Sequence, residues 1–85
     1  MKKQSAKAFR CPCCKFKTLG TLAQYEICPV CFWEDDGQND DNAAAIMGGP
    51  NGSISLCTAR DNYARFGAVD EKLLPYVRQP LPDEI

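Results

Sequence analysis

Histidine is missing from the 85 residues of this chain. Its absence excludes mixed cysteine–histidine metal sites and the histidine-bearing catalytic zinc sites. It also leaves the serines and cysteines without the base that activates such nucleophiles. The carboxylates of Glu34, Asp35 and Asp36 could move protons, but an acidic stretch alone is poor evidence for general acid–base catalysis. The sequence therefore predicts a protein that is not an enzyme.

Long apolar runs are missing as well. No stretch approaches the roughly 20 apolar residues of a membrane span, and the N-terminal residues include no apolar run of signal-peptide length. We therefore expect no membrane association and a cytoplasmic location. In that reducing compartment, closely spaced cysteines favour a bound metal over disulfides.

Six cysteines are what the chain has instead, and four of them show the spacing of a metal site. These four are Cys11, Cys14, Cys28 and Cys31, in the pattern C-x2-C-x13-C-x2-C. A gap of two residues points both sulfurs of a pair at one metal, and two such pairs supply a tetrahedron of thiolates at about 2.3 Å from zinc. Such a site is closed to substrate, so we expect one structural Zn²⁺. Iron in a rubredoxin-like site uses the same ligands and is the less favoured alternative.

A chain of this length needs such a staple because it buries only a modest core. We expect one domain with two tails: a flexible basic tail at residues 1–8, the cysteine-rich domain at 9–74, and a second tail at 75–85. Three prolines between residues 75 and 82 predict that the second tail is extended rather than helical.

A β-hairpin is predicted between the two cysteine pairs. Phe16 and Thr18, then Tyr25 and Ile27, alternate with polar neighbours around a turn signal at residues 19–21. With the metal ligands, this pattern indicates a double knuckle of the zinc-ribbon or rubredoxin type. The fold class that we expect is a small, metal-stabilised α+β domain.

One α-helix is predicted at residues 56–66, after the cysteine pairs. Ser53 or Ser55 can cap its start, and Gly67 lies where a left-handed residue ends a helix. An apolar stripe follows the helical period and comprises Leu56, Ala59, Tyr63 and Phe66. We expect Phe32 and Trp33 to cover the metal knuckle and to meet the Tyr63 and Phe66 face of this stripe as the main core. A stacking platform at Trp33 is the alternative.

Charge is distributed unevenly along the chain. Residues 1–25 carry six bases and no acid, whereas residues 34–41 carry five acids and no base. We expect Arg10, Lys15 and Lys17 to offset the negative charge that four thiolates leave on a divalent ion. The acidic stretch lacks the ligand register of a calcium loop, so we expect a solvated loop whose carboxylates at residues 34–36 point away from the metal.

Several motifs resemble a known family. They are CPCC at residues 11–14, YEICPVCFWEDDG at 25–37, NG at 51–52 and ARDNYARFGAVDE at 59–71. Together they are similar to the bacterial CPCC-type cysteine-rich domain, over residues 9–72. The resemblance implies a small zinc-binding domain and no particular activity. Cys57 is not part of the family pattern.

Cys13 is left over once Cys11 and Cys14 are paired. We favour a small residue that fills the tip of the first knuckle. The alternative is an exposed thiol that the metal cluster and Lys15 activate for redox chemistry or ligand exchange. The order C-P-x-C also occurs in thioredoxin-type motifs, but those need a βαβ context that this chain does not supply.

The function that follows is that of a small, zinc-stabilised binding module. Its partner is expected to be another protein, and the chain itself a monomer. One alternative is a nucleic-acid-binding zinc ribbon, which the basic first 25 residues favour and the acidic loop opposes. A further alternative is a thiol redox or metal-handling protein that uses Cys13.

Overall fold

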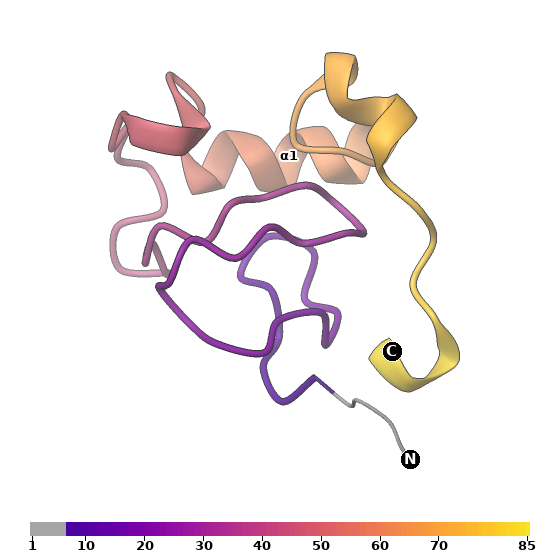
Figure 1. The fold of residues 1–85 in the computed structure, drawn as a ribbon. Helices are drawn as coiled ribbons and strands as arrows, with labels where there is room; N and C mark the ends of the chain where they lie inside the picture. The colour runs from indigo at the N-terminus through magenta and orange to yellow at the C-terminus, as the bar shows by residue number, and fades with distance from the viewer. Residues whose placement is uncertain (1–6) are drawn as a thin grey trace.

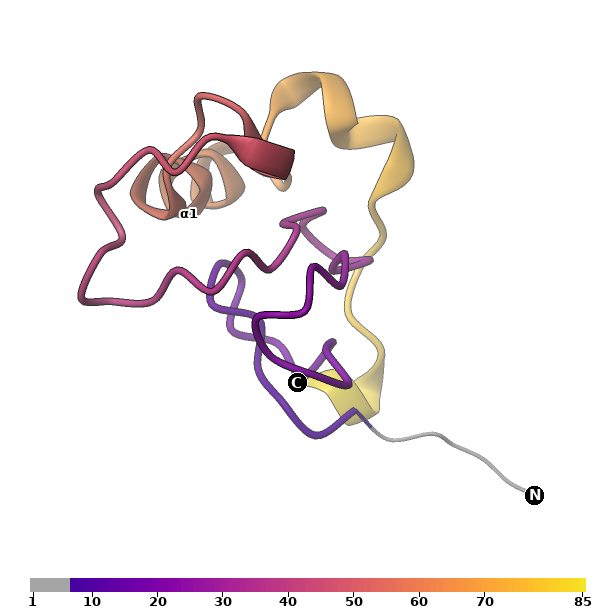
Figure 2. The same ribbon diagram turned by 60° about the vertical axis from the view of Figure 1, so that its left-hand side comes forward.

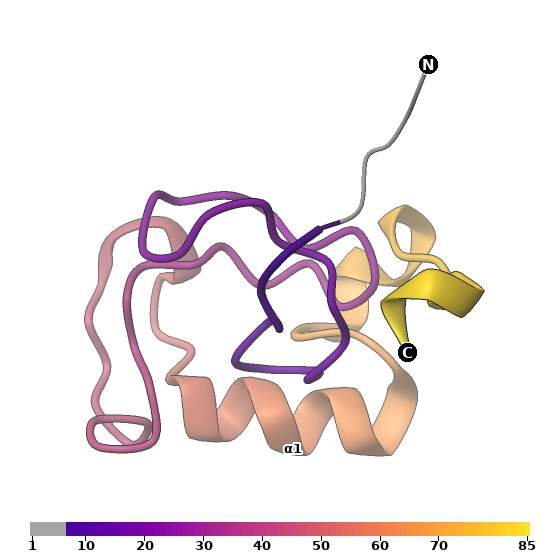
Figure 3. The same ribbon diagram turned by 90° about the horizontal axis from the view of Figure 1, so that it is seen from below.

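A computed structural model describes residues 7–85, so residues 1–6 of the predicted basic tail lie outside the described part. It has one α-helix, α1 (Leu56–Phe66), and three short 3₁₀ helices, η1 (Gly49–Asn51), η2 (Glu71–Tyr76) and η3 (Pro82–Glu84). In Figure 1 the loops that carry the cysteines lie beneath α1, and Figure 3 shows the helix running along one side of them. The coarse prediction of a small domain with one main helix is confirmed.

Helix α1 begins and ends at the residues that the sequence predicts. Ser55, rather than Ser53, caps its first turn by accepting a hydrogen bond from a backbone N–H. Gly67 takes the left-handed conformation with φ 97° and closes the last turn. Leu56 and Ala59 are completely buried, so the N-terminal half of the apolar stripe faces the core.

The predicted β-hairpin does not form within residues 7–85. The two antiparallel bridges that do form join Phe9 to Leu19 and Ile27 to Glu34, so each closes around one cysteine pair instead of joining the two. The intervening chain also leaves the extended conformation, because Tyr25 has a φ of 63°. Each cysteine pair is therefore flanked by two segments that pair with each other, whereas the predicted hairpin between the two cysteine pairs is absent from the described part of the chain.

The segment after Pro75 is not extended throughout, which corrects a second prediction. Pro75 lies inside η2, and Pro82 opens η3. Proline suits the first position of a helical turn because its fixed φ is already helical and its missing N–H needs no partner there. Between the two turns, residues 77–81 form no helix, as predicted.

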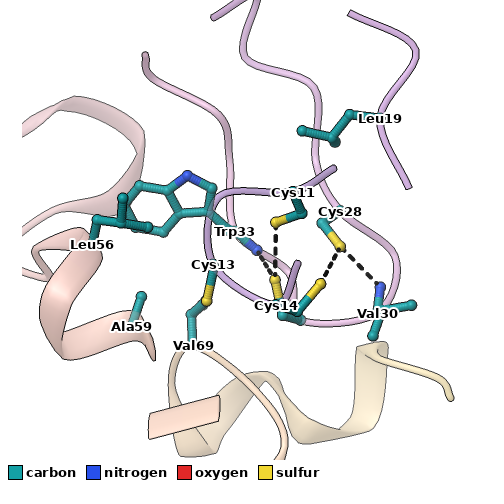
Figure 4. Close-up of a cluster of buried hydrophobic side chains, with 11 residues drawn as sticks. Cys11, Cys13, Cys14, Leu19, Cys28, Val30, Trp33, Leu56, Ala59 and Val69 are labelled. Carbon is teal, nitrogen blue, oxygen red and sulfur yellow. Dashed lines mark hydrogen bonds between the residues drawn. The ribbon is translucent and has the colours of Figure 1, made fainter. Parts of the chain in front are cut away.

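The core lies between α1 and the cysteine loops. Its largest completely buried side chains include Trp33, Leu19 and Leu56. Figure 4 shows the Trp33 indole between Leu56 and the cysteine loops. Tyr63 packs against this cluster, as predicted. Burial on all sides excludes Trp33 as a stacking platform for a ligand.

Among residues 7–85, no helix is both long enough and apolar enough to cross a membrane.

Candidate metal centre

Two cysteine loops with the same backbone geometry build the site. Knuckle 1 spans residues 11–16 and knuckle 2 spans residues 28–33. In each knuckle the N–H of the first cysteine donates to a carbonyl five residues later, Cys11 to Phe16 and Cys28 to Trp33, both at 2.9 Å. The two C-P-x-C sequences are therefore structural repeats of each other.

A left-handed residue follows the second cysteine of each knuckle. Lys15 has a φ of 71° and Phe32 a φ of 73°. The backbone N–H of each donates to the carbonyl of its knuckle's first cysteine at 2.8 Å. This conformation costs a residue with a side chain about 1 kcal/mol, so both knuckles maintain a turn that is locally unfavourable. The common requirement is a tight return of the chain that keeps two sulfurs on one side.

Four sulfurs meet where the knuckles face each other, and all lie within 4.8 Å of one another. Cys11 Sγ lies 3.6 Å from Cys31 Sγ, and Cys14 Sγ lies 3.7 Å from Cys28 Sγ. A tetrahedron with metal–sulfur bonds of about 2.3 Å has sulfur–sulfur edges of about 3.8 Å. Figure 4 shows the convergence of the sulfurs from both loops. The donor set and its spacing fit one tetrahedral metal ion.

Polar hydrogens from both knuckles surround these sulfurs. Val30 N–H lies 3.4 Å from Cys28 Sγ, and Trp33 N–H lies 3.4 Å from Cys31 Sγ. The buried hydroxyl of Thr18 is 3.0 Å from Cys28 Sγ. Such donors stabilise thiolate charge and orient metal ligands. Sequence reasoning missed Thr18, because nothing in its neighbourhood distinguishes it from a strand residue.

Two of the three bases that were expected to offset the thiolate charge make other contacts. Arg10 donates to the carbonyl of Lys15, and the Lys15 ammonium lies 3.9 Å from Asp40. The observed partners of the sulfurs are thus backbone N–H groups and one hydroxyl rather than these two side chains.

Crowding of the thiols separates their acidities. Hydrogen bonds from Cys11 and the other neighbouring thiols lower the pKa of Cys28 far below its usual range. The hydrogen bond with Cys14 raises the pKa of Cys11 above its usual range. Burial, and then the charge of the nearby thiolates, raises the pKa of Tyr63 to about 12. Four thiolates this close together repel one another, so the fully ionised cluster requires a cation.

Cys13 occupies in knuckle 1 the position that Val30 occupies in knuckle 2. Both side chains are buried, and Cys13 is only 5% exposed. Its sulfur lies outside the group of four, as Figure 4 shows. The alternative of an exposed, activated thiol at Cys13 is therefore wrong for this structure, and the preferred interpretation of a small filling residue agrees with it. Cys57 is exposed on α1.

The acidic loop is partly internal, which corrects the prediction of a solvated loop. Asp35 is 2% exposed, and its carboxylate accepts hydrogen bonds from Ala23 N–H at 2.8 Å and Gly37 N–H at 3.3 Å. Asp40 is exposed but pairs with Arg60 at 2.7 Å, and this guanidinium lowers the pKa of Asp40. The loop is thus tied to its surroundings at both ends.

Each knuckle is also held from a distant part of the chain through its proline carbonyl. Arg60 of α1 donates from Nε to the carbonyl of Pro12 at 2.9 Å. The backbone N–H of Arg78 donates to the carbonyl of Pro29 at 3.1 Å. A third contact joins Val69 N–H to the carbonyl of Cys31 at 2.9 Å. The segments that follow the knuckles in sequence therefore fix the position of the ligands.

Comparison with known proteins places these features in one family. No curated protein and no solved structure matches the chain significantly. The family model described as "Cysteine-rich CPCC" matches residues 9–84, which include both knuckles, α1 and η2. Because the match covers most of the chain, the protein belongs to the cysteine-rich CPCC family.

Proposed function

We propose that the four-cysteine centre holds one structural Zn²⁺ and that the protein is a small binding module rather than an enzyme. The observation that supports this proposal is the tetrahedral spacing of four buried sulfurs. Four protein ligands leave no open position for a substrate. Zinc is preferred to iron because closed sites of four cysteine thiolates are typical of structural zinc.

The ligands would be Cys11, Cys14, Cys28 and Cys31. When it is bound, the ion supplies charge compensation for the thiolates and a covalent-like link between the knuckles. Structural zinc contributes roughly 10–16 kcal/mol of apparent binding free energy in small peptides. That contribution matters most in a domain with a small core and little regular structure.

The surface beside knuckle 2 supports the proposal of a protein partner in the cytoplasm. The rings of Phe32 and Tyr76 lie 5.8 Å apart, and Tyr76 is 66% exposed. A groove of about 400 Å³ opens next to them, and its walls include Phe32, Ile54 and Leu73. An exposed tyrosine beside a partly buried phenylalanine and a partly apolar groove is typical of surfaces that bind proteins.

Nucleic-acid binding is the less favoured function because several bases already have acidic partners. Lys7 pairs with Glu26 at 3.3 Å, and Arg60 pairs with Asp40 at 2.7 Å. These pairs reduce the positive charge that is free to contact phosphates.

Cobalt substitution tests the metal part of the proposal. Titration of the metal-free protein with Co²⁺ should give the visible absorption of a tetrahedral tetrathiolate site, saturating at one ion per chain and displaced by Zn²⁺. Iron in the isolated protein would reveal itself by colour, whereas zinc is colourless. Failure to bind Co²⁺ or Zn²⁺ in a folded state would overturn the proposal.

A matched pair of surface variants tests the partner. Affinity capture from the native host with the zinc-loaded protein should retain a specific protein, and Tyr76→Ser should lose it. Tyr25→Ser is the control, since Tyr25 is also exposed but lies in the loop between the knuckles. Capture of no specific protein, or equal capture by both variants, would contradict an interaction through the knuckle 2 surface.

A further inference from the structure

The segment at residues 77–84 returns to the knuckles after η2, and we call it the C-terminal clasp. Figures 1 and 2 show it running from η2 along one side of the molecule to the cysteine loops. At its start, Arg78 N–H donates to the Pro29 carbonyl of knuckle 2 at 3.1 Å. At its end, the Glu84 carbonyl accepts from Lys17 N–H at 2.6 Å. The clasp therefore joins knuckle 2 to the residue that directly follows knuckle 1, on a path that is independent of the sulfurs.

The two residues that the clasp contacts, its anchors Pro29 and Lys17, are both close to Cys28 in the structure. Pro29 directly follows Cys28 in the chain. Lys17 directly precedes Thr18, whose hydroxyl is 3.0 Å from the Cys28 sulfur. If Cys28 moved away from knuckle 1, Pro29 would move away from Thr18. The clasp opposes this movement because it is hydrogen-bonded to Pro29 and to Lys17, the neighbour of Thr18.

An internal ion pair keeps the clasp in this shape. Arg78 Nη1 and Nη2 donate to the two carboxylate oxygens of Glu84 at 2.8 and 2.9 Å. The Leu81 N–H donates to the same carboxylate at 2.8 Å. Glu84 is only 7% exposed, so its carboxylate is largely shielded from water. A charged, bidentate pair is among the stronger hydrogen-bonded contacts in proteins, and here it ties the two anchors together.

We propose that Arg78 and Glu84 are positioning residues that control how fast the metal leaves the four-cysteine centre. The inference rests on the proposed metal function. A metal ion bound by four ligands dissociates by losing its bonds to them one after another. The geometry assigns Cys28 as a ligand that stays in place while the clasp is closed. The clasp therefore opens before the bond between the metal and Cys28 breaks.

The test follows metal loss from the zinc-loaded protein. Transfer of Zn²⁺ to an excess of the chromogenic chelator 4-(2-pyridylazo)resorcinol is measured at concentrations where the rate no longer depends on the chelator. Glu84→Gln keeps the shape of the side chain and removes its charge, and it should release zinc about tenfold faster. Arg78→Met should act in the same direction. Asp83→Asn, a neutralisation at the neighbouring exposed residue, should stay within about twofold of the original protein.

Amide hydrogen exchange separates a clasp from a general loss of stability. In Glu84→Gln the Lys17 and Arg78 N–H groups should exchange faster, whereas the N–H of Ala59 in α1 should be unchanged. In the unaltered protein the Lys17 and Arg78 N–H groups should exchange with the same opening equilibrium. Equal acceleration at Ala59 in Glu84→Gln, or different opening equilibria at Lys17 and Arg78 in the unaltered protein, would overturn the proposal. The second comparison needs no variant, so it does not depend on how well a variant folds.

Metal content distinguishes a failure of the proposed clasp from a failure of the proposed metal centre. One zinc per chain in the unaltered protein with equal release rates for Glu84→Gln and Asp83→Asn would overturn the clasp and leave the metal centre intact. Absence of bound zinc in the unaltered protein would overturn the metal centre and the clasp with it.

Discussion

Cys13 and Val30 show how one position in a repeated knuckle accepts different residues. Each follows the proline of its knuckle, and each side chain is buried. A thiol behaves as a small hydrophobe in such a place, so packing explains Cys13 without any chemistry of its sulfur. The crowding of cysteines in residues 11–14 is therefore one pair, Cys11 and Cys14, whose sulfurs join the four-sulfur cluster, with Cys13 as an apolar residue between its members.

Replacing this thiol by the residue of the other knuckle tests that equivalence. In urea denaturation of the zinc-loaded protein, Cys13→Val should change the free energy of unfolding by less than about 2 kcal/mol, because both side chains are small and apolar and the swap adds only about one methyl group. Cys13→Asn, which buries an amide at the same place, should cost more. A loss of more than about 3 kcal/mol in Cys13→Val would mean that the sulfur itself is needed.

Helix α1 is the one regular element of substantial length among residues 7–85, and its Arg60 contacts knuckle 1 at the carbonyl of Pro12. Its start depends on the cap at Ser55, whose hydroxyl accepts from Thr58 N–H at 3.1 Å. Loss of this bond would leave an N-terminal N–H without a partner and loosen the first turn, which carries the buried Leu56.

A pair of serine variants measures the cap. Ser55→Ala should lower the free energy of unfolding by about 1 kcal/mol, the usual cost of removing such a cap. Ser53→Ala is the matched control, and its effect should stay within about 0.5 kcal/mol because Ser53 is exposed. Similar losses in both variants, read from thermal or urea unfolding, would show that the cap has been assigned to the wrong residue.

The elements that the sequence predicts well are those set by neighbouring residues. Ser55, the apolar stripe and Gly67 define α1 completely, and a gap of two residues between cysteines is enough to predict that they converge. The β-hairpin failed because alternation of residues does not show which partner a segment pairs with. The burial of Asp35 could not be foreseen from the sequence. One of its hydrogen-bond partners, Ala23, lies 12 residues earlier in a loop, and the other is the nearby Gly37.

At the scale of the whole molecule, long-range contacts replace regular structure. The carbonyls of Pro12, Pro29 and Cys31 each accept a hydrogen bond from a residue at least 38 positions later in the chain. These contacts converge on the two knuckles from α1, the segment after it and the clasp. The arrangement of the chain as a whole therefore depends on the knuckles staying together.

Acid should weaken this arrangement, because it protonates carboxylates that the fold stabilises in their charged form. The guanidinium of Arg78 lowers the pKa of Glu84. For Glu26, burial alone would raise the pKa, but hydrogen bonds from Gly20 and Lys7 outweigh it and lower the pKa. A carboxyl whose pKa is lower in the folded state stabilises the fold above its unfolded pKa of about 4.5. That stabilisation is lost as pH falls through the folded value.

Comparison with Glu84→Gln isolates this effect from acid release of the metal. The difference in urea midpoint between the unaltered protein and Glu84→Gln should be largest above pH 4.5 and should shrink as the pH falls below it. A difference that stays constant from neutral to acid pH would contradict a charged role for Glu84 in the folded state.

The zinc content of two neighbouring cysteine variants tests the central claim most directly. Zinc per chain is determined by elemental analysis after purification in zinc-containing buffer and removal of loosely bound ions. The unaltered protein and Cys13→Ser should each hold one zinc ion, whereas Cys14→Ser, altered one position away, should hold none and be largely unfolded. Equal zinc content in the two variants, or no zinc in the unaltered protein, would contradict a metal centre built from the four converging cysteines.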